Sequence, residues 1–256
     1  MTSALERRVF LGVPFTPLGL DHALDLIVRR RMDEPFAYVA TPNAQHTVAA
    51  HRNDKRFCEG HTGAWLLLND SRILRLIARW VFGFDLPLAA GSDLVVALFQ
   101  HGVPPTTPVV MLGGDAEVEH RMRSRFGLTD IRRFDPPMGF HHDPAEIERC
   151  IAFVLHRPAR YIFMVVGAPQ SEVVAARIVA TGRASGIGLC VGSALNFLTG
   201  VQPRAPEIWR RSNLEWAYRL MKNPRGHFRR VFIESFPIIW IAFKARLRRQ
   251  PAHAAE

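Results

Sequence analysis

Short apolar runs alternate with longer amphipathic stretches over the first 200 residues of the chain. Strands are predicted at the apolar runs Val9–Val13, Ala37–Thr41, Ala64–Leu68, Val109–Gly113, Ile131–Phe134, Tyr161–Val166 and Gly188–Val191. Helices are predicted at Leu18–Arg31, Ala44–Ala50, Ser71–Val81, Leu94–His101, Ala116–Phe126, Pro144–His156 and Pro169–Thr181. Apolar strands separated by helices are typical of a parallel sheet covered on both faces, so we expect an α/β fold.

The strand pattern stops after Gly200, and two helices are predicted in the rest of the chain. The first runs from Pro206 to Met221, and the second runs from about Gly226 to Arg249, after a break at Pro224. In the second helix the apolar positions recur at steps of three and four, which places them on one face as a stripe: Phe228, Phe232, Phe236, Ile239, Trp240 and Phe243. We therefore expect a domain of residues 8–203 and a helical appendage of residues 204–250.

The composition of the chain indicates a globular protein and excludes several other classes. The chain has 256 residues, 48% of them apolar, which is enough for a globular core and excludes a largely disordered chain. Its 3 cysteines are scattered, so neither a disulfide framework nor a cysteine-rich zinc site is expected. The apolar runs are far shorter than the roughly 18 residues of a membrane-spanning helix. The N-terminal stretch also lacks the apolar core of a signal peptide, so we expect a cytoplasmic protein.

Basic charge is concentrated in the appendage. The whole chain has a net charge of +10, and residues 204–256 hold twelve basic and four acidic residues, a local net charge of +8. Basic residues bracket the apolar stripe, which is typical of a helix lying on an anionic membrane surface. Two alternatives stay open, namely packing of the stripe on the protein's own core and a contact between copies of the chain. A nucleic-acid surface fits poorly, because phosphate binding rewards exposed charge rather than bulky apolar side chains.

The loops that follow the predicted strands form the candidate site, because parallel α/β sheets bind ligands beyond the carboxyl ends of their strands. These loops are Thr41-Pro42-Asn43, Asn69-Asp70-Ser71, Gly113-Gly114-Asp115, Gly167-Ala168-Pro169 and Gly192-Ser193-Ala194. The glycine turn at Gly113 enters a helix, a geometry that lets backbone amides approach a phosphate. It lacks the complete Rossmann dinucleotide and P-loop patterns, so a simple tight turn is the alternative.

Asp70 is the candidate general base. It lies between a predicted strand and a predicted helix, where the helix N-terminus favours an ionised carboxylate. Such a carboxylate can accept the proton of a hydroxyl group. The alternative is a plain helix cap, which is the commoner role of an aspartate at such a position. The 11 histidines show no metal-binding spacing, and we expect neither a metal nor a cofactor.

Taken in order, the motifs resemble those of the WecG/TagA/CpsF bacterial glycosyltransferases (glycosyltransferase family 26). The first half supplies Thr41-Pro42-Asn43-Ala44-Gln45, Asn69-Asp70-Ser71 and Gly91-Ser92-Asp93-Leu94. The second half supplies Leu112-Gly113-Gly114, Gly139-Phe140, Gly167-Ala168-Pro169 with Glu172, and Val191-Gly192 through Asn196-Phe197 and Gly200. The strongest part is Arg204-Ala205-Pro206, followed by Leu214-Glu215-Trp216-Ala217-Tyr218-Arg219-Leu220 and Asn223-Pro224-Arg225. The resemblance covers roughly residues 10–232.

The resemblance implies a Rossmann-like α/β domain and a C-terminal appendage that helps to complete the site and contacts the membrane. It implies an inverting, metal-independent glycosyltransferase that works at the inner face of the cytoplasmic membrane. The donor would be a UDP-sugar carrying a hexose, N-acetylmannosamine or its uronic acid. The acceptor would be a polyprenyl-diphosphate-linked saccharide, extended during exopolysaccharide or cell-envelope polysaccharide synthesis.

The resemblance also implies roles for individual residues. Asp70 matches the catalytic base, and Thr41 and Asn43 match polar residues beside it. Arg219 and Arg229 match appendage arginines that meet diphosphate charge, where cationic groups stabilise a leaving group. The other expected substrate-binding residues are Gly113, Gly114, Gly139, Phe140, Gly167, Pro169, Gln170, Ser171, Glu172, Asn196, Arg204 and Arg225.

Three positions depart from the family pattern. Ser171 stands where glutamine is common, Leu88 stands where arginine is common, and Gly226 replaces an arginine that is shifted to Arg225. These positions belong to the expected donor and phosphate contacts. They motivate an alternative function, a non-catalytic nucleotide-binding or scaffolding subunit of a polysaccharide assembly complex.

Overall fold

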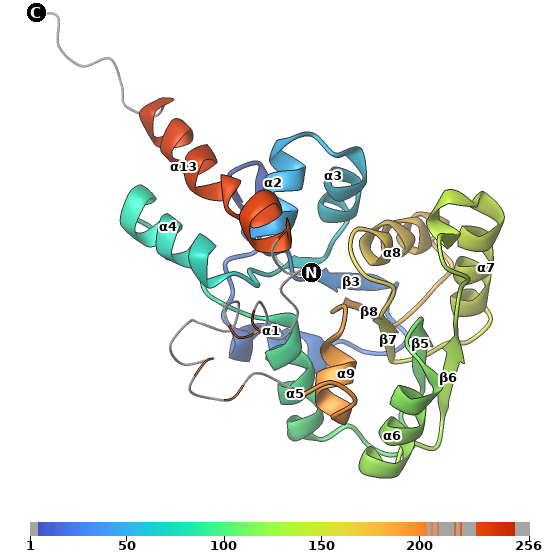
Figure 1. Cartoon of the computed structure of the whole chain (residues 1–256). Helices are drawn as coiled ribbons and strands as arrows, with labels where there is room; N and C mark the ends of the chain where they lie inside the picture. Colours follow the sequence, from blue (N-terminus) through green and yellow to red (C-terminus); the bar gives the residue numbers. More distant parts are fainter. Residues whose placement is uncertain are drawn as a thin grey trace, which may run out of the picture.

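A parallel sheet forms the centre of the molecule. The computed structural model describes residues 5–203, 206, 209, 218, 221 and 229–248. Its six-stranded sheet has the order β4-β3-β8-β7-β5-β6, and every pair of neighbours is parallel (Figure 1). The strands are β3 (Ala37–Ala40), β4 (Leu66–Leu67), β5 (Val109–Leu112), β6 (Ile131–Phe134), β7 (Tyr161–Met164) and β8 (Ile187–Cys190). The predicted α/β class is confirmed.

Helices cover both faces of this sheet (Figure 1). The core on one face is built with α2 (Ala44–His51), α3 (Lys55–Thr62), α4 (Arg72–Phe82), α7 (Pro144–Leu155) and α8 (Gln170–Thr181). The core on the other face is built with α1 (Leu20–Arg29), α5 (Gly91–Gly102), α6 (Ala116–Phe126) and α9 (Ala194–Thr199). In β7, Ile162 and Met164 belong to the first core, whereas Tyr161 and Phe163 belong to the second. A strand buried on both faces needs apolar residues at every position, which is why the apolar runs locate the strands.

The predicted strand Val9–Val13 does not join the parallel sheet, so this prediction is wrong. The segment is divided between β1 (Arg8–Phe10) and β2 (Val13–Phe15), which form a separate antiparallel hairpin. Leu11 and Gly12 turn the chain with φ angles of 52° and 89°, a conformation that suits a two-residue hairpin turn. The sequence hides this turn, because Leu11 looks like one more apolar strand residue.

The pattern does not predict α3 and α9. The buried side of α3 consists of Phe57, Gly60 and His61, so it carries little apolar periodicity. The helix α9 has only 6 residues, fewer than two turns, and its pattern is too short to be recognised. Both helices owe their stability to packing against their neighbours rather than to a strong local signal.

The predicted helix Gly226–Arg249 is interrupted within the described residues. A π-helical segment, η2 (Arg229–Ser235), is followed by α13 (Pro237–Arg248). Pro237 lacks a backbone N–H and is accommodated at the first position of α13, where no intrahelical donor is needed. The predicted helix Pro206–Met221 lies almost entirely outside the described residues, of which only 206, 209, 218 and 221 fall in its range.

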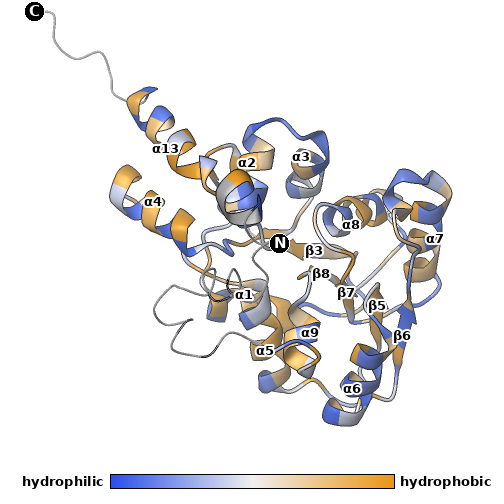
Figure 2. Ribbon diagram, viewed as in Figure 1, coloured by the Kyte–Doolittle hydropathy of each residue, from blue (hydrophilic) through white to orange (hydrophobic). Residues whose placement is uncertain are grey.

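The apolar face of α13 that was predicted as a stripe is exposed. Phe236, Ile239, Trp240 and Phe243 are 44–58% exposed, and Figure 2 shows apolar residues along the projecting helix. The core instead takes a different face of α13, through Ile238, Ile241 and Ala242. Four of the six stripe residues thus lie on the surface of the described structure. No helix in the described part of the chain is long and apolar enough to cross a membrane.

Candidate functional site

The strand-end loops predicted as the site lie along one edge of the sheet. All six strands are parallel, so the loops after β3, β4, β5, β7 and β8 leave from the same edge. In spatial order they are the loops at Asp70, Thr41, Gly192, Gly167 and Gly113. Three strand spacings separate the Asp70 loop from the Gly167 loop, a distance of roughly 14 Å along the edge. The edge therefore divides into an Asp70 end and a glycine-turn end.

The Asp70 loop contacts the Thr41 loop directly. The backbone N–H of Asp70 donates to the carbonyl oxygen of Pro42 at 3.0 Å. Thr41 is buried, and the first residue of α5 abuts it, because a Cβ on Gly91 would come within 2.8 Å of the Thr41 Oγ1. Two loops and the N-terminus of α5 thus meet around Thr41 and Asp70.

Asn69, whose role the sequence does not indicate, fixes the backbone that carries Asp70. Its side chain is 1% exposed, and its Nδ2 donates to the Leu86 carbonyl oxygen at 3.3 Å. Its Oδ1 accepts the backbone N–H of Ser71 at 2.9 Å, and its carbonyl oxygen accepts the N–H of Ala89 at 2.9 Å. A buried amide with both ends engaged holds its segment in one conformation. The only local signal is a polar residue placed directly after an apolar run.

Ser71, rather than Asp70, is the cap of α4. The Ser71 hydroxyl oxygen accepts the backbone N–H of Leu74 at 3.3 Å, in the geometry of an N-cap. The plain-cap interpretation of Asp70 is therefore wrong, since the neighbouring serine has that role. The Asp70 carboxylate precedes the cap at the positive end of the α4 dipole.

Asn43 lies on the same edge, at the start of α2. Its Oδ1 accepts the backbone N–H of His46 at 3.2 Å, which makes it the N-cap of α2. Its carbonyl oxygen accepts the Thr47 hydroxyl at 3.0 Å. The structure accordingly brings Asn43 near Thr41 and gives it a structural hydrogen bond as well. Its expected catalytic role stays a prediction.

The glycine turns after β5 and β7 are adjacent. Gly113 has a φ angle of +80°, and a Cβ there would come within 2.7 Å of Val166 Cγ1, so only glycine fits. The chain after β5 leads to β6 on one side, and the chain after β7 leads to β8 on the other. Connections that diverge from neighbouring strands open a crevice, which is where open α/β sheets bind ligands. Gly113, Gly114 and Gly167 lie in the two loops at this switch point of the sheet.

Pro169, Ser171 and Glu172, which follow Gly167, are buried, whereas Ala168 and Gln170 are half-buried. A cis peptide joins Ala168 and Pro169, and Gln170 begins α8. The Ser171 hydroxyl donates to the Met164 carbonyl oxygen at 3.3 Å, and Ser171 is 1% exposed. Glu172 is 4% exposed and packs against Gly60 of α3, and burial raises the pKa of its carboxyl group to about 7. Both side chains are therefore buried in the fold, and their contact with substrate stays a prediction.

Three further predicted substrate-binding residues lie in the segments that follow β6 and β8. Gly139, with a φ angle of +80°, leads into the short 3-10 helix η1 (Phe140–His142), and Phe140 is buried in the core. Asn196 lies on α9, and its Oδ1 is buried without a hydrogen-bond partner among the described residues. Buried acceptors are almost always hydrogen-bonded in folded proteins, so this oxygen is available to a donor from a ligand.

The appendage reaches the Asp70 end of the edge through Glu234. The Gln45 Nε2 on α2 donates to Glu234 Oε2 at 2.7 Å, and Arg229 Nε lies 3.2 Å from Glu234 Oε1. Through Glu234, Arg229 is held beside α2. The α2 residue in this contact, Gln45, comes two positions after the Asn43 cap. The other predicted appendage arginines, Arg204, Arg219 and Arg225, lie outside the described residues.

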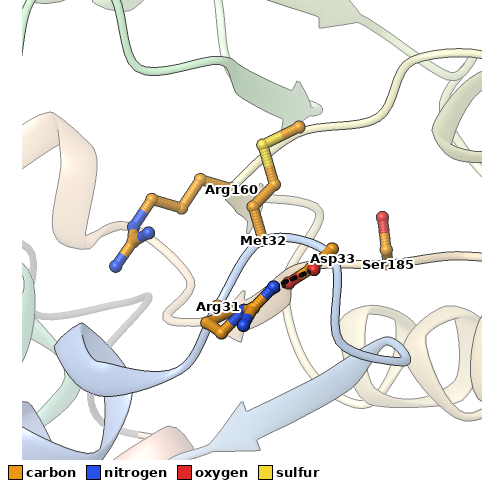
Figure 3. Close-up of a pocket in the computed structure, with 5 residues that line it drawn as sticks. All are labelled: Arg31, Met32, Asp33, Arg160 and Ser185. Atoms are coloured by element: carbon orange, nitrogen blue, oxygen red, sulfur yellow. Dashed lines mark hydrogen bonds and ion pairs between the residues drawn. The ribbon is translucent and has the colours of Figure 1, made fainter.

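A cavity of about 460 Å³ lies at the opposite edge of the sheet. Arg31, Met32, Asp33, Arg160 and Ser185 line it, all just before β3, β7 or β8 (Figure 3). Arg31 and Asp33, two of these lining residues, form an ion pair with each other (Figure 3). This cavity is separate from the predicted site. Within the described ranges, no group of three or more histidine, cysteine, aspartate or glutamate side chains could hold a metal ion.

A parallel sheet covered by helices on both faces defines a Rossmann-like α/β protein, a class that binds its ligands at the carboxyl edge of the sheet. The model of the WecG/TagA/CpsF glycosyl transferase family matches residues 8–252, and the chain belongs to this family. It is therefore a glycosyltransferase of a family that acts in cell-envelope polysaccharide synthesis. The family resemblance expected from the ordered loops is confirmed.

Proposed function

We propose that the protein transfers a sugar from a UDP-sugar to a polyprenyl-diphosphate-linked saccharide, with inversion at the anomeric carbon. The donor sugar would be a hexose, N-acetylmannosamine or its uronic acid, and the product would be exopolysaccharide or another envelope polysaccharide. The reaction would take place at the inner face of the cytoplasmic membrane and would need no metal ion.

The position of Asp70 carries the proposal. Asp70 lies at the carboxyl edge, its backbone bonds to the Thr41 loop through Pro42, and Ser71 has taken the capping role. Asp70 would accept the proton of the acceptor hydroxyl as that oxygen attacks the anomeric carbon. The bond between the anomeric carbon and the UDP oxygen would break on the opposite face, and UDP would leave as an anion.

The glycine-turn crevice and the appendage would hold the donor. At Gly167 a Cβ would meet nothing within 4 Å, and this open space would let backbone amides of the turns at Gly113, Gly114 and Gly167 approach phosphate. Asn196 Oδ1 could accept a donor group of the nucleotide. Arg229, held near α2 by Glu234, would meet the diphosphate charge together with Arg204, Arg219 and Arg225. A cation near the diphosphate stabilises the negative charge that develops as UDP leaves.

The test is the Asp70→Asn variant, assayed with UDP-sugars and a lipid-diphosphate acceptor. Transfer should fall by roughly 10²–10⁴-fold, the usual contribution of a general base. UDP should stabilise the variant against heat as it does the unaltered protein, because the nucleotide crevice is elsewhere on the edge. Asp130→Asn is the matched control, since this aspartate precedes β6 at the opposite edge.

Unchanged turnover by Asp70→Asn would remove Asp70 from the catalytic role. A chain that binds UDP-sugars and never turns over would instead support the scaffolding alternative. Continued transfer in the presence of a chelator would support the metal-independent mechanism, and complete inhibition would contradict it.

A further inference from the structure

The helix α4 exposes large apolar side chains along one face. Ile73, Leu76 and Trp80 are 36%, 49% and 76% exposed, and their spacing of three and four residues aligns them. The opposite part of the helix is used by the core, through Leu74 and Ile77. Isolated exposed apolar residues are common, but an aligned row on one helix marks an interaction surface. Exposure increases along α4 with distance from Asp70.

The helix α13 adds a second exposed apolar face next to α4. The two helices share one hydrophobic core, which includes Ile77 of α4 and Ile241 of α13, and they project from the same side of the sheet (Figure 1). Figure 2 shows apolar residues along both helices. The exposed apolar side chains on α13 are Ile239, Trp240, Phe243 and Leu247, and Phe236 is exposed just before the helix begins.

Basic residues accompany both apolar faces. The α4 sequence contains Arg72, Arg75 and Arg79, the α13 sequence contains Lys244, Arg246 and Arg248, and neither helix contains an acidic residue. The Arg79 guanidinium lies 5.6 Å from the Trp80 ring centre, and the Lys244 ammonium lies 5.1 Å from the Trp240 ring centre. Tryptophan and basic residues beside apolar side chains are typical of the lipid–water interface. In a symmetric dimer the same faces would bring like charges together, so an anionic membrane fits better than a second copy.

We infer that α4 is a second membrane-docking element beside α13 and that it holds Asp70 at a fixed height above the lipid. This inference rests on the proposed membrane-bound acceptor. The helix begins two residues after Asp70 and has 11 residues, so its far end lies about 16 Å from the catalytic edge. With Trp80 at the inserted end, Asp70 stands over the headgroup layer, where a lipid-linked diphosphate carries its first sugars. The helix that directly follows the loop of the base is therefore also a helix that contacts the membrane.

The test uses the full chain and vesicles of two compositions, phosphatidylcholine alone and phosphatidylcholine with phosphatidylglycerol. The double variant Leu76→Ser/Trp80→Ser should bind the anionic vesicles at least about tenfold more weakly, because each buried apolar side chain adds to partitioning. Val179→Ser, an exposed apolar position on α8, is the matched control and should bind as the unaltered protein does. Transfer to a lipid acceptor in vesicles should fall with binding, whereas transfer to a short-chain soluble acceptor should not change.

Each other result has a distinct meaning. If the α4 variant binds vesicles normally while Ile239→Ser/Phe243→Ser loses binding, α4 is not a docking element and the membrane role of the appendage stands. If neither variant changes binding, both the inference and the proposed membrane location fail. If the α4 variant converts a lipid-free dimer into a monomer, the surface joins copies of the chain and the inference is overturned. Thermal unfolding of each variant checks that it is folded.

Discussion

Two buried titratable side chains, Glu172 and His61, lie on the packed helices α8 and α3. Burial raises the pKa of Glu172 from 4.5 to about 7 and lowers the pKa of His61 from 6.5 to about 4. Both shifts keep the neutral form in the folded protein, because a charged group loses its hydration in the core. In the unfolded chain, Glu172 ionises above about pH 4.5 and His61 becomes charged below about pH 6.5. Their effects on the stability of the fold therefore have opposite signs.

The Glu172→Gln variant should change how the free energy of unfolding depends on pH. In the unaltered protein Glu172 lowers stability as pH rises from about 4.5 to about 7, since the unfolded chain then binds fewer protons than the folded one. The total effect is of the order of 3 kcal/mol. Glutamine keeps the neutral shape and removes this slope. Urea unfolding between pH 4.5 and 8 should show the variant gaining stability relative to the unaltered protein as pH rises.

His61→Leu is the opposing control. Above pH 6.5 His61 is neutral in both the folded and the unfolded chain. As pH falls from 6.5 toward about 4, only the unfolded chain binds the proton, so the free energy of unfolding decreases. Between pH 4.5 and 6.5 the two slopes largely cancel in the unaltered protein. Glu172→Gln should consequently show stability rising with pH in this window, and His61→Leu should show it falling. Identical slopes in all three proteins would contradict both pKa shifts.

At the scale of elements, Glu234 joins the appendage to α2. It accepts the Gln45 amide at 2.7 Å and pairs with Arg229 at 3.2 Å. The exposed pair with Arg229 contributes little by itself, but the part-buried, charge-assisted hydrogen bond from Gln45 contributes more. The contact spans 189 positions of sequence, so no local pattern could have indicated it.

Replacing Glu234 with alanine should loosen this junction. We expect the free energy of unfolding to fall by about 1 kcal/mol and the KM for the UDP-sugar to rise, because Arg229 is no longer held beside α2. Denaturant unfolding and steady-state transfer kinetics measure the two effects. Asp25→Ala, which removes an exposed pair with Arg29 at 2.7 Å on α1, is the control and should be nearly neutral. An unchanged KM would show that Glu234 does not orient an arginine for the donor.

A helix or strand could be predicted from the sequence where all of its buried positions hold apolar residues. β7 could be located from Tyr161–Val166, because each of its positions lies in a core. The α3 helix could not, because Gly60 and His61 form part of its buried side and neither reads as apolar. The hairpin turn at Leu11 and Gly12 depends on backbone angles that a leucine rarely adopts.

On the scale of the whole molecule, charge and apolar surface gather on one side. The amino-terminal 203 residues are nearly neutral, and the appendage is strongly basic. Its helix α13 lies next to α4, which contains three arginines. A one-sided distribution of this kind orients a protein on an anionic surface before any apolar side chain inserts. The same orientation would turn the Asp70 end of the sheet edge toward the lipid.

Removing two charges from α13 should measure the electrostatic part of membrane binding. Arg246→Ala/Arg248→Ala should lose about 2 kcal/mol of binding to anionic vesicles, or roughly 30-fold in partitioning, at low salt. The loss should shrink as salt is added, because salt screens exposed charges. Arg132→Ala/Arg149→Ala removes equal charge from β6 and α7 and should have little effect. Equal losses in both variants would indicate that net charge alone, rather than its position, determines binding.

The sequence by itself determined the doubly covered parallel sheet, the set of loops at its carboxyl edge and the amphipathic basic appendage. Each of these depends on a periodic pattern or on neighbouring residues, which local chain geometry converts directly into a face or a turn. Only the tertiary structure decided that Asn69 fixes the Asp70 loop, that Ser71 is the cap, that Glu234 joins Gln45 and that α4 stands beside α13. These features depend on contacts between residues far apart in the chain or on a choice between adjacent polar side chains. Which polar side chain forms a hydrogen bond depends on how the backbone is packed in three dimensions, and this packing cannot be read from a pattern along the sequence.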